Sequence, residues 1–243
     1  MEAKNNFKDI FKNYNKPINN TIIFLTIILF IYCYFGTFSF FDKYFSYVAD
    51  YQYWSIIFHN CSAFVLFFGF GLLWTKLVQK QSLKEIGLRK GNWKLGLILC
   101  AIATVVVPLL ALSTVLDSGM TSTYPLIDFN TYGTWYYLLG YFASYILYYV
   151  GWEFLFRGIG LFNLEKGGIS PLGAILIITF ISALIHTSIG GFGKPMIETL
   201  SAIPAGLIFG YITYKTKSIY YSLYIHALVG ILTDVFIFLI VLS

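Results

Sequence analysis

Long runs of apolar residues alternate with short polar connections along most of the chain. The runs cover residues 21–41, 54–78, 93–116, 132–163, 170–189, 197–214 and 219–241. Each run is long enough, or nearly so, to cross a hydrocarbon core about 30 Å thick as an α-helix rising about 1.5 Å per residue. The pattern predicts an all-α polytopic membrane protein with about seven transmembrane helices (six to eight), the first of them a retained span.

Lysine and arginine are concentrated in alternate connections. The basic connections are residues 1–20, residues 79–94 and the segments around Lys166 and Lys217, whereas residues 42–53 and 190–196 hold one lysine each and residues 117–131 hold none. Basic connections stay in the cytoplasm. We therefore expect a cytoplasmic N-terminus in a bacterial or archaeal plasma membrane.

The composition supports this fold class. The chain is 58% apolar and 11% charged, whereas an ordinary soluble domain is about 25% charged. The deficit excludes a disordered chain and a nucleic-acid-binding domain, and it argues against a soluble enzyme. Cys33, Cys61 and Cys100 lie in apolar runs without metal-ligand or redox spacing, so we expect them to be small buried hydrophobes.

The connections also suggest how the chain is organised. We expect a basic cytoplasmic segment at 1–20, a transmembrane hairpin at 21–78, a basic cytoplasmic connection at 79–94 and a transmembrane bundle at 95–243. The bilayer itself is then the first expected partner.

Few ionisable groups lie within or beside the apolar runs. They are His59, Glu153, Arg157, His186, Lys194, Glu198, His226 and Asp234, and all but His59 belong to the last four runs. A charge at bilayer depth costs at least about 2.5–3.5 kcal/mol, so such groups face a protein interior and have partners. The grouping predicts a shared polar cavity, and we interpret His59 as structural.

Spacing suggests which of these groups are neighbours. Glu153 and Arg157 are four residues apart with the acid first, the favourable order for an ion pair on one helix. His226 and Asp234 are eight residues apart and share a face. His186 precedes a glycine-rich stretch, 187–196, of the irregular kind that membrane proteins place along cavities.

Two histidines and a carboxylate from different helices can polarise a water molecule in two ways. His186 and His226, with Glu153 or Glu198, could hold a zinc ion with one open position. Alternatively, a carboxylate could act as general base while the histidines stabilise an oxyanion. Taken singly, each group also fits a structural ion pair or an interhelical hydrogen bond.

Residues 82–241 resemble the CPBP intramembrane proteases, named for CAAX prenyl-protein processing and bacteriocin processing and also called the Abi family. The resemblance rests on S-L-K-E-I-G-L-R-K-G-N-W-K-L-G from residue 82, E-F-L-F-R-G at 153–158, His186, G-K-P-M-I-E-T at 193–199, and T-K-S-I-Y-Y-S-L-Y-I-H at 216–226. It implies a helical bundle with Glu, His and His around a water on the cytoplasmic side. It also implies hydrolysis of a peptide bond in a membrane-associated or prenylated substrate, with zinc or with a glutamate-activated water.

The chain departs from the family's motifs at three positions. Trp152 stands where the first glutamate would be, Ser182 replaces a phenylalanine, and Gly230 replaces Asn or Asp. The residues that carry over are Glu153, Arg157, His186 and His226. Because neighbouring helix positions point about 100° apart, Glu153 does not inherit the geometry of position 152. We expect Glu198 to supply the missing carboxylate, provided that it lies within reach of a histidine.

The depths of the two histidines raise a question. His186 lies 16 residues into its run and His226 only seven into its own, a difference of about 13 Å in depth. Either the fifth run begins late, inside the loop, or the two do not share a site.

Three functions stay open at this point: an intramembrane peptidase, a pseudoprotease that serves as scaffold or regulator, and a small proton-coupled transporter. A peptidase requires one cavity holding a carboxylate and both histidines. A scaffold can fill that space with apolar side chains, and a proton relay would string its acids across the bilayer.

Overall fold

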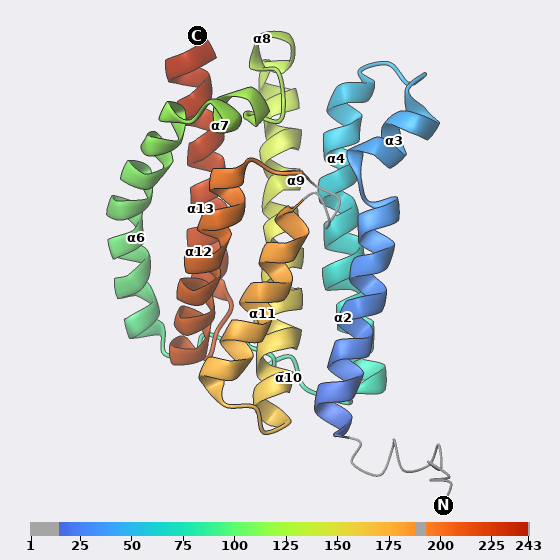
Figure 1. Ribbon diagram of the computed structural model, residues 1–243, viewed down its shortest axis with the longest axis vertical. Helices are drawn as coiled ribbons and strands as arrows, with labels where there is room; N and C mark the ends of the chain where they lie inside the picture. The colour runs from blue at the N-terminus through green and yellow to red at the C-terminus, as the bar shows by residue number, and fades with distance from the viewer. Residues whose placement is uncertain (1–14, 188–192, 243) are drawn as a thin grey trace, which may run out of the picture.

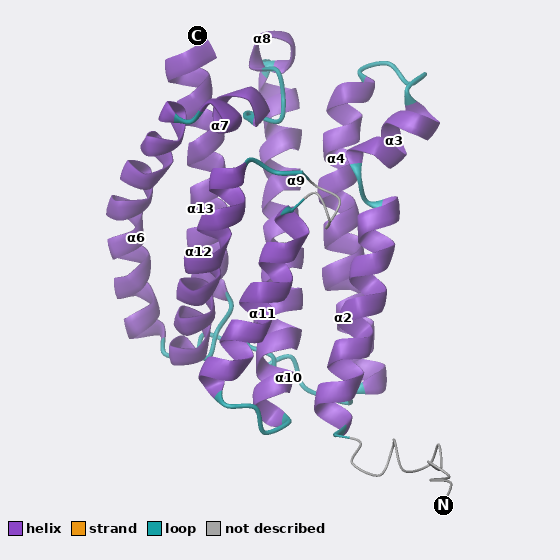
Figure 2. Cartoon of the chain, in the orientation of Figure 1, coloured by secondary structure: helices purple, strands orange, loops and turns teal. Residues whose placement is uncertain are grey.

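The computed structural model describes residues 15–187 and 193–242, and all regular structure in these two ranges is helical. The longer helices stand side by side in one bundle (Figure 1), and short loops join them (Figure 2). The helices are α2 (Lys16–Phe35), α3 (Phe38–Phe45), α4 (Tyr51–Ala63), α5 (Gly71–Leu73), α6 (Trp93–Ser113), α7 (Ser118–Thr123), α8 (Phe129–Tyr132), α9 (Trp135–Glu153), α10 (Leu161–Lys166), α11 (Pro171–His186), α12 (Met196–Thr216) and α13 (Tyr220–Ile237). Wider π-helical turns at Phe64–Phe70, Trp74–Val78, Phe154–Gly160 and Phe238–Leu242 extend α4, α5, α9 and α13.

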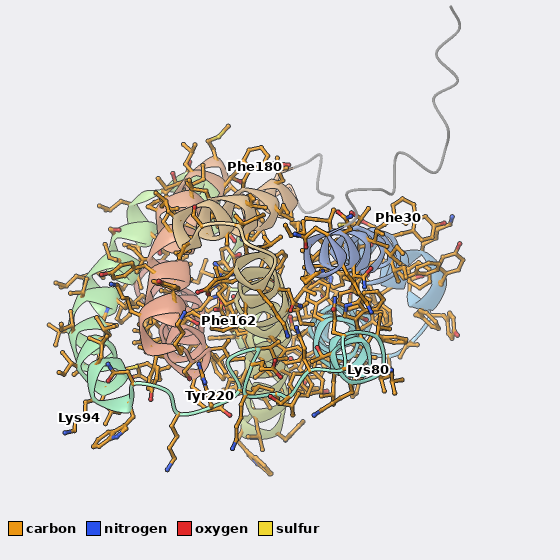
Figure 3. All side chains as sticks on the ribbon, turned by 90° about the horizontal axis from the view of Figure 1, so that it is seen from below. Phe30, Lys80, Lys94, Phe162, Phe180 and Tyr220 are labelled. Carbon is orange, nitrogen blue, oxygen red and sulfur yellow. The ribbon has the colours of Figure 1, made fainter. Side chains whose placement is uncertain are left out.

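Five helices are long and apolar enough to cross a membrane. They are Lys16–Phe35, Tyr51–Val78, Trp93–Leu116, Met196–Thr216 and Tyr220–Leu242. The apolar helix α11 is shorter, and the predicted run at 132–163 corresponds to a continuous helix from Trp135 to Lys166. Large apolar side chains such as Phe30 and Phe180 point outward from the bundle (Figure 3) and are 76% and 64% exposed. The predicted fold class, a polytopic helical membrane protein, is confirmed; seven crossings and a cytoplasmic N-terminus stay predictions.

The first apolar run differs from its prediction at both ends. The helix starts at Lys16 rather than at residue 21, because the Asn15 side chain accepts a hydrogen bond from the backbone N–H of Ile18 and Pro17 occupies the first turn. It ends before Gly36, and Thr37 caps the separate helix α3. Residues 1–14 of the basic segment 1–20 and residues 188–192 of the glycine-rich stretch 187–196 lie outside the described residues.

The helix formed by α9, the π-helical turn and α10 lies in the middle of the bundle (Figure 1). Phe154, Leu155, Phe156 and Ile159 on this helix are fully buried. This central position exposes less of the helix to lipid and explains how polar residues at its middle, Glu153 among them, come to face other helices.

The connection 79–92 crosses the foot of the bundle, the end that Figure 3 views. The Ile86 side chain is fully buried, and the carbonyl of Gly87 accepts a hydrogen bond of 3.1 Å from Ile219 N–H. At Gly91 the backbone has φ +54°, and a Cβ there would overlap the Thr216 carbonyl. The connection is thus packed against the turn between α12 and α13.

Glu85 joins the connection 79–92 to α10 through an ion pair with Lys166. Its carboxylate accepts hydrogen bonds from the backbone N–H of Ser82 at 2.8 Å and from the Ser82 hydroxyl at 2.9 Å. Lys166 Nζ lies 3.1 Å from it. These interactions, led by the backbone bond, lower the pKa of Glu85 from 4.5 to about 2.

We predict that Glu85→Gln lowers the thermal unfolding midpoint at neutral pH by a small amount, since the group is exposed. A lowered pKa means that the ionised carboxylate stabilises the fold above pH 4.5 and that this contribution is lost as the pH falls toward 2. Unfolding in detergent, followed by tryptophan fluorescence, should therefore show a difference from wild type that shrinks over that pH range. Asp42→Asn is the matched control, and a difference independent of pH would contradict this role.

Candidate active site

A cavity of about 460 Å³ lies among α4, α6, α9, α11, α12 and α13. The polar side chains that line it include His59, Asn60, Tyr124, Tyr149, Ser182, His186, Lys194, Glu198 and His226. The structure therefore brings both candidate histidines and one candidate carboxylate to the same space inside the bundle.

Glu153 and His226 form a direct pair across α9 and α13. Glu153 is fully buried, and its Oε1 lies 2.8 Å from His226 Nδ1. Because a carboxylate oxygen accepts hydrogen bonds, Nδ1 carries the proton and Nε2 is left for other partners. The His226 ring is packed between Tyr149 and Phe209, with ring centroids 4.6 and 4.9 Å away, which fixes its orientation.

Arg157 contacts the same carboxylate oxygen of Glu153. Its Nη1 is 3.3 Å from Glu153 Oε1, as the four-residue spacing predicts. The guanidinium also lies 5.6 Å from the centre of the Phe209 ring. Glu153 Oε2 has no hydrogen-bond partner within the described part of the chain. The buried carboxylate is thus held by one cation and one imidazole.

His186 and Glu198 form the second pair. His186 Nδ1 lies 3.0 Å from the Ser182 carbonyl, so Nδ1 carries the proton and the neutral ring presents Nε2 as an acceptor. Glu198 Oε1 lies 4.0 Å from Nε2. Two acceptors that share one donating water lie about 4.0–4.5 Å apart, because each hydrogen bond is about 2.8 Å long. At 4.0 Å the two atoms are too far apart for a direct hydrogen bond and close enough to share one water.

Two neighbours hold Glu198 in place. The Tyr124 hydroxyl donates to Glu198 Oε2 at 2.9 Å, and Lys194 Nζ lies 3.7 Å from Oε1. Lys194 also donates to the Tyr124 hydroxyl. Tyr124 lies in the connection 117–131, where the sequence pattern carried only topological information, and it was not among the predicted site residues.

Both histidines line one cavity, so the question of their depths has an answer. A difference of about 13 Å would apply only if α11 and α13 began at the same level of the bundle. Figure 1 shows that α11 begins lower in the bundle than the turn between α12 and α13. His186 therefore lies less far above His226 than the residue counts suggest.

Two other ionisable residues lie outside this arrangement. Both ring nitrogens of His59 are engaged, Nδ1 with the Gly36 carbonyl at 2.7 Å and Nε2 with the Tyr32 hydroxyl at 3.2 Å, which fits a structural role. Asp234 is fully buried two turns beyond His226 and accepts a hydrogen bond from the Tyr141 hydroxyl.

The motif departures have structural counterparts. Trp152 is buried and presents its ring to that of His186, with centroids 5.6 Å apart at 82°, so it forms a wall of the cavity. A Cβ at Gly230 would overlap the Tyr149 hydroxyl. Only glycine leaves room for this hydroxyl one turn beyond His226, a contact that depends on helix packing and could not be predicted from spacing.

The described donors do not fit a zinc ion. Among residues 15–187 and 193–242, no group of three or more His, Cys, Asp or Glu side chains could hold a metal. Of the predicted ligands, Glu153 contacts both Arg157 and the His226 Nδ1–H through Oε1, so His226 presents only Nε2 to the cavity. A catalytic zinc site requires three protein ligands, so no step proposed below uses a metal.

Residues 129–232 match the model of a protein family, the type II CAAX prenyl endopeptidase Rce1-like family. The match runs from α8 into α13 and includes both histidine–carboxylate pairs. It confirms, for this segment, the resemblance to the CPBP proteases. Neither the curated proteins nor the solved structures gave a match.

We predict that Arg157→Met lowers the free energy of unfolding by about 3–5 kcal/mol, because it leaves the Glu153 carboxylate buried without its cation. Glu153→Gln in the same chain should recover part of this loss, since it removes the orphaned charge. Denaturant unfolding in detergent measures the Arg157→Met variant, the Glu153→Gln variant and the double variant. Additive effects of the two substitutions would show that the residues do not form an energetically coupled pair.

Proposed function

We propose that the protein is an intramembrane endopeptidase that hydrolyses a peptide bond of a membrane-associated protein or peptide. The observation that carries this proposal is that two histidine–carboxylate pairs border one cavity within the membrane-spanning bundle. The family match supports the class of reaction. The substrate and the roles of individual residues are our proposal.

The His186–Glu198 pair is suited to activate water. A water that donates one hydrogen to His186 Nε2 and the other to Glu198 Oε1 turns its lone pairs toward the cavity. As the water oxygen bonds to the substrate carbonyl carbon, Glu198 takes its proton. The Tyr124 hydrogen bond and the nearby Lys194 ammonium group hold Glu198 in position for that transfer.

The Glu153–His226 pair is suited to stabilise the negative charge that develops on the carbonyl oxygen. With Glu153 behind Nδ1–H, a protonated His226 presents Nε2–H as a donor to the oxyanion. Arg157 keeps Glu153 ionised. The Tyr149 hydroxyl, beside the His226 ring, is a second donor. When the C–N bond breaks, the proton held by Glu198 passes to the leaving amine, which restores the carboxylate.

The geometry favours this function over the two alternatives. The cavity holds a carboxylate and both histidines, as a peptidase requires, and apolar side chains do not fill it. Glu198 lines the cavity and Glu153 contacts His226 at its wall, so these two carboxylates belong to one site and do not form a chain across the bilayer. A scaffold or regulator and a proton-coupled transporter are therefore left as outcomes of the experiment.

We predict that Glu198→Gln and His226→Ala each lower the hydrolysis rate by at least about 100-fold, the usual contribution of general acid–base groups. The assay uses purified protein in liposomes and a library of quenched fluorescent peptides with a transmembrane segment. Glu165→Gln makes the same carboxylate-to-amide change outside the cavity and should leave the rate unchanged. Equal rates for wild type and all variants would favour the scaffold.

We also predict that 1,10-phenanthroline and EDTA leave the rate unchanged, because the described donors lack a third metal ligand. Loss of activity with chelator, followed by recovery with zinc, would overturn the glutamate-activated water and favour the metal alternative. Size-exclusion chromatography after treatment controls for unfolding by the chelator.

A further inference from the structure

We infer that the active-site cavity opens to the half of the membrane opposite the cytoplasm, and that its substrate is a membrane-inserted peptide segment reaching it from that side. The class of substrate rests on the proposed function. The side of the opening rests on the charges at the two ends of the bundle and on the residues that line the cavity.

The two ends of the bundle differ strongly in charge. We define the basic end by the connection 79–92 and the turns at 166–170 and 217–219, and the acidic end by the segments 36–50 and 117–134. The segments of the basic end carry Lys80, Lys84, Arg89, Lys90, Lys166 and Lys217, with Glu85, and the helix ends that they join add Lys76, Lys94 and Lys215, with Glu165. The acidic end carries Asp42, Asp50, Asp117 and Asp128, with Lys43. By the positive-inside rule the basic end is cytoplasmic.

The cavity extends from the middle of the bundle toward the acidic end. From α6 it is lined by Leu110, Ala111 and Ser113 in the last turn, and Met120 of α7 lies against it. From α12, which runs from the acidic toward the basic end (Figure 1), it is lined by residues 197–209 but by none of 210–216. The cavity thus reaches the end of the bundle away from the cytoplasm, whereas Arg157 and His226, which also line it, lie nearer the basic end and form its inner wall.

Packed side chains close the path toward the basic end. Below Glu153, the hydroxyls of Thr213 and Ser222 bond to each other at 2.9 Å, and both residues are fully buried. Beneath them, the Ile86 and Ile219 side chains are buried, with 0% and 1% of their surface exposed. A peptide arriving from the cytoplasm would have to displace this layer.

The cavity has an open side between α6 and α12. Two residues that line it are also largely exposed on the outer surface of the bundle, Leu110 at 59% and Ile208 at 56%. The rim is therefore apolar and faces lipid, whereas the histidines lie inside. Such an opening suits an apolar peptide segment that slides in from the bilayer and meets water only at the reacting bond.

This arrangement differs from the site on the cytoplasmic side that the resemblance implied. A prenylated protein terminus lies in the cytoplasmic leaflet and would face the closed end of the cavity. An exported peptide, or a segment already inserted across the bilayer, presents a bond at the depth of the open end. The geometry therefore points to a substrate of this second class.

Cysteine labelling in vesicles tests the side of the opening. In a chain with Cys33, Cys61 and Cys100 replaced by Ala, Ser201→Cys places a thiol on the cavity wall. Lys90→Cys and Ser118→Cys mark the basic and acidic ends. Leu109→Cys, a lipid-facing neighbour on α6 that is 67% exposed and does not line the cavity, is the matched control. A sulfonated maleimide reports which thiols reach water from outside right-side-out or inverted vesicles.

We expect Ser201→Cys to react in right-side-out vesicles together with Ser118→Cys, and Lys90→Cys to react only in inverted vesicles. Leu109→Cys should stay unlabelled in both. Reaction of Ser201→Cys together with Lys90→Cys would overturn the inference. So would no reaction from either side, or reaction of Lys90→Cys from outside.

Hydrolysis in oriented vesicles then tests the substrate class. Lipid-anchored peptides supplied to the acidic end should be cleaved, and the same peptides supplied to the basic end should not. Cleavage from the basic end would overturn the inference while leaving the peptidase standing. No cleavage from either end, with labelling as expected, would reject the proposed function but not the side of the opening.

Discussion

The cost of burying charge in a bilayer governs how this bundle is assembled. Glu153 is fully buried, and a carboxylate at that depth persists only with partners. Arg157, one turn along the same helix, supplies the cation, while His226 reaches the carboxylate from α13. The pairing with His226 fixes how α9 and α13 meet. The rotation of α13 in turn sets Gly230 against Tyr149 and aims the free nitrogen of His226 at the cavity.

The second pair depends on a different kind of support. Glu198 and His186 do not touch, and Tyr124 and Lys194 hold the carboxylate from the acidic end. On one side of the cavity, Glu153 is held by direct contacts within the helices. On the other side, Glu198 is held partly by Tyr124, which lies in the connection 117–131 outside the spans. Because the first pair is rigid and the second has room for a water, the two are suited to different parts of one reaction.

Hydropathy predicted the helical runs because lipid-facing and buried positions in a bilayer are both apolar, and the rare charges predicted which helices share a cavity. Helix ends were predicted less well, since the break at Gly36 depends on capping by Thr37. The 4.0 Å separation of His186 and Glu198 and the roles of Tyr124 and Tyr149 depend on tertiary register, which no local pattern encodes. The level at which α11 starts also depends on tertiary packing. It explains why the residue counts overestimate the difference in depth between His186 and His226.

The connection 79–92 has a consequence for the order of assembly. Its hydrogen bonds from Arg89 to the Lys217 carbonyl and from Tyr221 to the Lys90 carbonyl join residues 128 and 131 positions apart. The first two spans can insert as soon as they leave the ribosome, but the connection finds its partners only when nearly the whole chain has been made. Long-range contacts of this kind form late. Until then the strongly basic segment lacks the hydrogen bonds that join it to the turn between α12 and α13.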